Sequence, residues 1–109
     1  MLTREQLVGQ HFLPVEEVKV RALKGTVGVQ GMTAGDALDY HKAVEKTAKD
    51  GDVNVESLAK LLVRCVVNDK RERVYSDDEW PEIMKWPYSA LQTVSRVAMR
   101  LNNGSAEGN

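Results

Sequence analysis

A broad apolar stripe between Val55 and Val66 is the feature that most constrains how this chain can fold. The stripe repeats at the three- and four-residue spacing of an α-helix and comprises Val55, Leu58, Leu61, Leu62, Cys65 and Val66. Asn54 stands directly before it, in the position of a helix cap. A stripe this wide predicts a central helix that is covered by other elements. The chain must therefore supply partners that bury it.

The C-terminal third supplies a second amphipathic helix and a short one before it. Ser76 and Glu79 have the spacing of a capping box, whereas Pro81 falls one turn later and should keep that helix short or distorted. Pro87 suits the first turn of the last helix. The buried stripe predicted for that last helix is Leu91, Val94, Ala98 and Leu101.

A further helix is expected over residues 33–49. Thr33 can cap it, and Asp50-Gly51 can end it, with Gly51 suited to a left-handed conformation. The apolar face predicted from the helical spacing is Ala37, Leu38, His41, Val44 and Ala48.

Two alternating segments before this helix predict a β-hairpin. Val18 and Val20 alternate with polar residues in the first strand, Val27 and Val29 do so in the second, and Lys24-Gly25 supplies a turn. Two strands alone are marginal in water, so the hairpin needs a helix or another strand against it. Its edges also offer a route to self-association by strand pairing. Val66-Val67 and Val74-Tyr75 flank a polar connector, so a short second hairpin is an open alternative there.

These elements define an α+β fold, mainly α-helical, with an N-terminal β-hairpin packed on a bundle of three to four helices. A chain of 109 residues fits one domain, which we place at 15–102. Residues 1–14 are expected to form a flexible arm, and residues 103–109, which are small and polar, a flexible tail.

The charge and hydropathy of the chain argue against two classes of partner. The formal net charge is −1 with well-mixed signs, so no segment provides the basic field that binds a phosphate backbone. No stretch approaches the roughly 20 apolar residues of a membrane span. The N-terminus also lacks the apolar run of a signal peptide. We therefore expect no nucleic-acid partner, no membrane partner and a cytoplasmic location.

The titratable residues give little support to an enzyme or a metal site. His11 and His41 are far apart, and no His or Cys spacing matches a metal motif. Cys65 lies among apolar residues and is expected to pack in the core. The acidic run Asp77-Asp78-Glu79 is explained by the preference of helix starts for acids. We therefore expect no catalytic residue, no cofactor and no metal, and interpret His41 as a partly buried helix residue.

Trp80, Trp86 and Tyr88 crowd into nine residues, and both tryptophans precede proline. Such aromatic residues anchor protein interfaces when exposed, and equally cover the ends of a core when buried. The same two interpretations hold for the hairpin valines. The candidate partner-binding residues are therefore Val18, Val20, Val27, Val29, Trp80, Trp86 and Tyr88.

The order of these features resembles the small tail assembly chaperones of long non-contractile-tailed bacteriophages and their prophages. The resemblance covers about residues 15–103 and begins with the strand pair. Four segments then carry it, in this order: Gly31-Met32-Thr33-Ala34-Gly35-Asp36, Leu61-Leu62-Val63-Arg64-Cys65-Val66-Val67, Val74-Tyr75-Ser76-Asp77-Asp78 and Arg100-Leu101-Asn102. The chain departs from similar proteins at 68–72, a turn where they usually place a glycine. The two Trp-Pro pairs are also not typical of the family.

The resemblance implies a function without cofactor or catalytic residues. Such proteins bind the tape measure protein, keep it soluble and help to recruit tail tube subunits, and they leave before the virion is complete. It also implies a location in the cytoplasm of the bacterial host. Members of the family commonly make a second, longer product by programmed ribosomal frameshifting, and the extension would attach at residues 103–109.

Two other classes of function are alternatives. A small regulatory protein, such as an antitoxin or DNA-binding repressor, should carry several basic residues on one helix face, and the last helix offers Arg96 and Arg100. A small enzyme would require a catalytic pair, for which His41 is the residue to test.

Overall fold

The computed structural model describes residues 1–7, 13–45 and 54–103 of the chain, and the account below is confined to them. Its elements follow in the order β1 (Val15–Val20), a 3₁₀ turn η2 (Arg21–Leu23), β2 (Gly25–Gln30), α1 (Ala34–Glu45), α2 (Val55–Cys65), β3 (Val66–Val67), a 3₁₀ turn η4 (Asp77–Glu79), α3 (Trp80–Ile83) and α4 (Tyr88–Asn103). The predicted α+β, mainly helical fold is confirmed.

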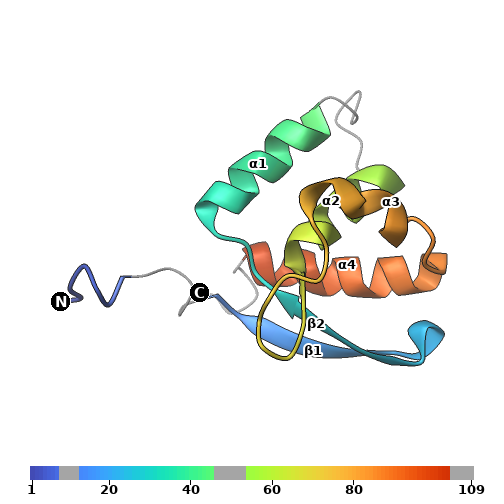
Figure 1. The fold of residues 1–109 in the computed structure, drawn as a ribbon, viewed down its shortest axis with the longest axis horizontal. Coiled ribbons are helices and arrows are strands. Elements are labelled where there is room, and N and C mark those ends of the chain that lie inside the picture. Colours follow the sequence, from blue (N-terminus) through green and yellow to red (C-terminus); the bar gives the residue numbers. More distant parts are fainter. Residues whose placement is uncertain (8–12, 46–53, 104–109) are drawn as a thin grey trace.

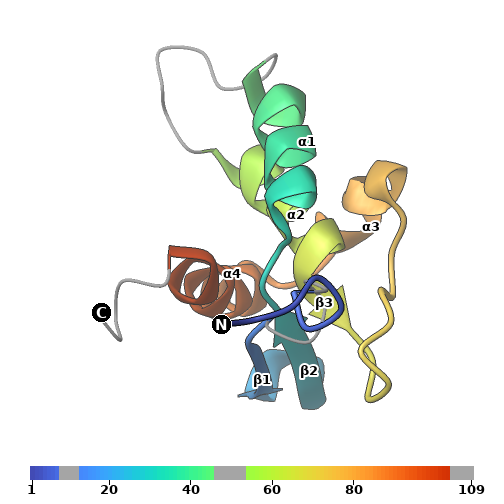
Figure 2. The same ribbon diagram turned by 90° about the vertical axis from the view of Figure 1, so that its left-hand side faces the viewer.

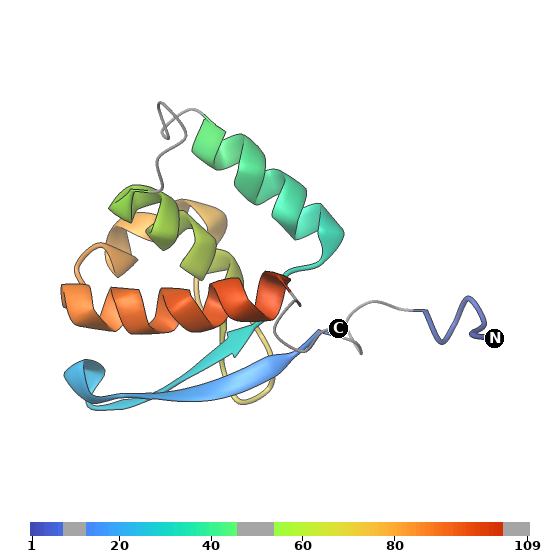
Figure 3. The same ribbon diagram turned by 180° about the vertical axis from the view of Figure 1, so that it is seen from behind.

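A three-stranded antiparallel sheet, in the order β1-β2-β3, forms one layer of the molecule. α4 crosses one face of this sheet, and α1, α2 and α3 lie beyond it (Figure 1). Figure 3 shows α4 between the sheet and α1 from the opposite side. The hydrophobic core fills the space between the layers, and its largest fully buried side chains are Leu62, Ile83, Val29, Val63, Val94 and Cys65.

The predicted hairpin is confirmed, with Val18 opposite Val27 and Val20 opposite Gly25. Lys24 closes the turn in the left-handed region, at φ 57° and ψ 36°. Sequence reasoning anticipated two strands here, whereas the structure adds a third. β3 pairs Val66 with Val29 and Val67 with Gly28.

The end of α2 explains the third strand. The predicted apolar stripe runs on to Val66, but the helix ends at Cys65 and Val66 is extended, with φ −77° and ψ 124°. The chain then turns back, so that Val67 bridges Arg73 and Val74 N–H donates to the Val66 carbonyl at 3.2 Å. The second hairpin left open from the sequence therefore exists as a single bridge.

Local signals placed most helix starts correctly. Asn54 Oδ1 accepts from Ser57 N–H at 2.8 Å, and Thr33 Oγ1 accepts from Asp36 N–H at 3.1 Å. Glu79 accepts from Ser76 N–H at 2.8 Å, as a capping box requires. α3 is only four residues long and carries Pro81 in its first turn, as expected.

The predicted contact face of α1 is correct for Ala37 and Val44 and wrong for Leu38 and His41. Leu38 is 54% exposed and His41 is exposed, whereas Ala37, Tyr40 and Val44 are half-buried. The helix is rotated toward Tyr40 because the ring of this residue, rather than Leu38, packs on the core. Ala48 and the predicted stop at Gly51 lie outside the described residues.

Candidate partner-binding surfaces

The hairpin valines belong to the core. Val18, Val20 and Val29 are 8%, 3% and 0% exposed, and Val27 is partly buried against the same cluster. They share one core cluster with Leu91, Val94 and Ala98 of α4. α4 lies across one face of the sheet (Figure 2). In this conformation their side chains are not accessible to a partner. The part of the hairpin that can still bind a partner is the outer edge of β1.

The aromatic cluster is divided between core and surface. Trp80 and Trp86 are partly buried and pack against the core. Lys60 Nζ lies 5.1 Å from the centre of the Trp80 ring, within the range of a cation–π interaction. Tyr88 is 59% exposed, and neighbouring Met84 is 42% exposed. Of the three aromatic residues predicted to bind a partner, Tyr88 therefore has the side chain that is largely exposed.

A groove between α1 and α4 was not predicted from the sequence. It encloses about 540 Å³ and is lined by Met32, Thr33, Ala34, Ala37, Tyr40, His41, Leu61, Met99, Asn102 and Asn103. Met99 is 37% exposed, and burial raises the pKa of the Tyr40 hydroxyl. The lining comes from three separated segments, 32–41, Leu61 and 99–103, so only the position of Met99 beside the stripe of the last helix hinted at it. The groove offers apolar side chains together with polar groups, a combination that suits an amphipathic peptide helix.

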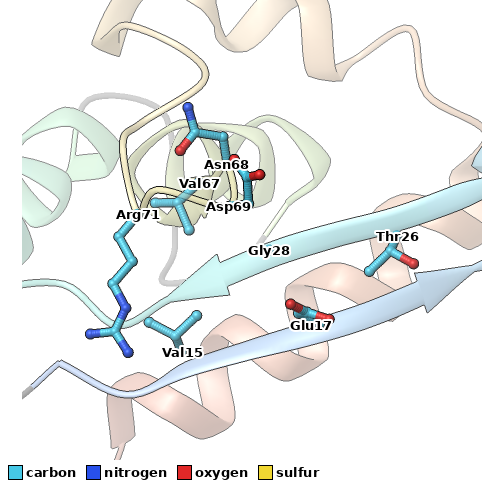
Figure 4. A pocket seen from close by; sticks show the side chains of 8 residues that line it. All are labelled: Val15, Glu17, Thr26, Gly28, Val67, Asn68, Asp69 and Arg71. Carbon is cyan, nitrogen blue, oxygen red and sulfur yellow. The ribbon is translucent and has the colours of Figure 1, made fainter.

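A second hollow lies on the outer face of the sheet, at the tip of the 68–73 turn (Figure 4). It encloses about 490 Å³ and is lined by Val15, Glu17, Thr26, Gly28, Val67, Asn68, Asp69 and Arg71. Glu17, Asp69 and Arg71 are exposed and of mixed sign. The hollow therefore offers polar contacts of both signs.

The acidic run at 77–79 has a structural role. Asp77 accepts a hydrogen bond from Arg73 at 2.6 Å and lies 3.8 Å from the buried Arg64. The hydrogen bond from Arg73 lowers the pKa of the Asp77 carboxyl. Arg73 also donates twice to the Val63 carbonyl, at 3.0 and 2.8 Å. Sequence reasoning missed the two arginines, although a charged Arg64 within an apolar run was a visible signal.

Cys65 is fully buried, as predicted, and burial raises the pKa of its thiol to about 11. His41 is exposed and lies beside the Tyr40 ring, with 5.4 Å between the ring centres. Within the three described ranges, no group of three or more His, Cys, Asp or Glu could hold a metal ion. The same residues include no helix that is long and apolar enough to cross a membrane.

Together these features define a small α+β domain with a covered sheet, a groove between two helices and an exposed aromatic residue. No family model matches the chain, and no curated protein sequence matches it. Among solved structures, it is similar to the tail assembly chaperone of bacteriophage HK97. The two are 16% identical, the likeness covers 91% of this chain and 96% of that one, and the TM-score is 0.63. The chain therefore has the fold of that tail assembly chaperone.

Proposed function

We propose that this chain is a phage tail assembly chaperone. It binds the tape measure protein, keeps it soluble and helps to recruit tail tube subunits, working in the cytoplasm of the bacterial host and leaving before the virion is complete. The observation that carries the proposal is the likeness to the HK97 chaperone over nearly the whole of both chains. A longer frameshifted product is part of the same proposal.

The groove between α1 and α4 is the surface that suits this role best. A tape measure protein is a long helical chain whose apolar residues need cover before the tail tube surrounds it. The groove presents the apolar side chains of Met32, Ala37 and Met99 between two helices. Contacts of this kind bind an amphipathic helix and, being small in area, release it again.

Co-expression with the tape measure protein of the same phage tests the function. The soluble yield of that protein should rise, and the two chains should elute together on gel filtration. An unchanged yield without a complex would refute the proposal. Salt-sensitive retention of this chain on DNA would instead favour the regulatory class.

Paired variants locate the contact. Met99→Glu places a charge at the groove and should reduce capture, whereas Gln92→Glu makes the same charge change at an exposed site on α4 and should not. Tyr88→Ala, alone and with Met84→Ala, tests the aromatic region in the same assay. If Tyr88→Ala reduces capture and Met99→Glu does not, the aromatic region is the contact and the assignment to the groove is wrong.

A further inference from the structure

β1 is one of the two edge strands of the sheet, and its second edge has no strand beside it within the described residues. Gly31 N–H donates to the Pro14 carbonyl at 2.9 Å, which continues the register of β1 with β2. Backbone groups alternate in direction along an antiparallel strand. The N–H and C=O groups of Glu16, Val18 and Val20 therefore face β2. Those of Val15, Glu17 and Lys19 face the open edge.

The charges on this edge are arranged symmetrically about Val18. Glu17 and Lys19 flank it, both are exposed, and both lie on the sheet face opposite the helices. Figure 4 shows Glu17 on this outer face, away from α4. Edge strands usually carry charges that discourage pairing. Here the two charges have opposite signs at equal distance from one residue.

We propose that β1 pairs antiparallel with β1 of a second copy, about a two-fold axis through Val18. Glu17 of each copy then lies directly opposite Lys19 of the other. Each such pair exchanges both of its backbone hydrogen bonds, because Glu17 and Lys19 are the residues whose backbone groups face the edge. The three-stranded sheet becomes a six-stranded one, with the helices of both copies on the same face.

The charges select this register over its neighbours. A pairing must place edge-facing residues opposite edge-facing residues, so the axis passes through a residue and not between two. An axis through Glu17 brings the two Glu17 side chains together, and an axis through Lys19 does the same for the lysines. Like charges directly opposite are destabilising, and opposite charges are stabilising. The axis through Val18 is the one that gives opposite charges at both positions.

Charge reversal tests the pairing with the full chain alone, independently of the tail-assembly role. Sedimentation equilibrium should show a dimer of the wild-type chain that dissociates on dilution. Glu17→Lys and Lys19→Glu should each raise the dissociation constant at least about tenfold, since both cross-strand pairs become repulsive. An equimolar mixture of the two variants should dimerise again, because every pair is then of opposite sign. The double variant Glu17→Lys/Lys19→Glu should dimerise alone.

Lys42→Glu is the matched control, an exposed charge reversal on α1 that should leave the dimer unchanged. Circular dichroism of each variant verifies that it is folded. A wild-type chain that stays a single copy at all concentrations would overturn the proposal. So would a dimer that survives both single reversals, or variants that fail to rescue one another when mixed.

Discussion

The side-chain oxygen of Asn102 accepts a hydrogen bond from the backbone N–H of Met32, 70 positions earlier in the chain. The amide of the same side chain donates to the Ala98 carbonyl at 2.8 Å and lies 3.5 Å from the sulfur of Cys65. The link between β2 and α1, the end of α2 and the end of α4 therefore meet at one residue. Three of the segments that carry the family resemblance contain Met32, Cys65 and Asn102, so their order in the sequence reflects a contact in the fold.

Asn102→Ala should lower the free energy of unfolding by about 1–3 kcal/mol, because the partly buried Met32 N–H loses its acceptor. Urea denaturation measures the change, with the slope of the transition unchanged. Asn103→Ala, at the exposed neighbouring position, should have little effect. Equal midpoints for the two variants would show that the contact does not stabilise the fold.

Gly28→Ala should weaken the pairing of β2 with β3. A Cβ at this position would lie 2.7 Å from the carbonyl oxygen of Val67, which is backbone and cannot move aside alone. We expect a loss of about 1–3 kcal/mol in thermal or urea unfolding. The matched control is Gly35→Ala in the first turn of α1, where the nearest atom is 3.9 Å away. That variant should be neutral or stabilising by up to about 1 kcal/mol.

Arg71→Gly should stabilise the protein. Arg71 has a φ of 65°, which an L-residue adopts at a cost of about 1–2 kcal/mol and glycine adopts freely. This is the turn at 68–72, where the sequence lacks the glycine that the family resemblance leads us to expect. The positive φ identifies position 71 as the one that a glycine would suit. The gain should be up to about 1 kcal/mol, since glycine also adds entropy to the unfolded chain. Lys70→Gly, one residue earlier, should instead be neutral or destabilising, and a gain there would contradict the explanation.

Asp77→Asn should change how stability depends on pH. The lowered pKa of the Asp77 carboxyl means that its ion pair stabilises the fold above the unfolded value of about 3.9. That stabilisation is lost as the pH falls through the lower, folded-state pKa. Near neutral pH the wild type should exceed the variant by about 0.2–1 kcal/mol, the range for a half-exposed pair, and the difference should vanish in strong acid. Asp78→Asn, at the adjacent exposed position, leaves the Arg73–Asp77 ion pair in place and is the matched control, which should change the free energy of unfolding little at neutral pH in the same urea titrations.

Local rules account for the parts of the fold that were predicted correctly. The caps at Thr33 and Asn54 depend on backbone groups three residues away, and Pro81 shortens α3 by its own geometry. The buried face of α4, with Leu91, Val94 and Ala98, follows from helical spacing alone. Each of these features is determined within about one helical turn, so a single sequence is sufficient to find it.

The remaining features depend on residues that are distant in the chain. Val66 continues the stripe of α2 by spacing, yet it leaves the helix because Val29 offers it a strand partner. The face of α1 was predicted only in part, because helical spacing does not say whether Leu38 or Tyr40 meets the core. For the two tryptophans and the hairpin valines, the sequence allows both a core and an interface position. The residues that pack against them in the fold decide between the two. The sequence by itself thus determines the caps, turns and amphipathic stripes, because each depends on residues close together in the chain. The third strand, the groove and the open edge of β1 depend on how separated segments pack, so only the tertiary structure decides them.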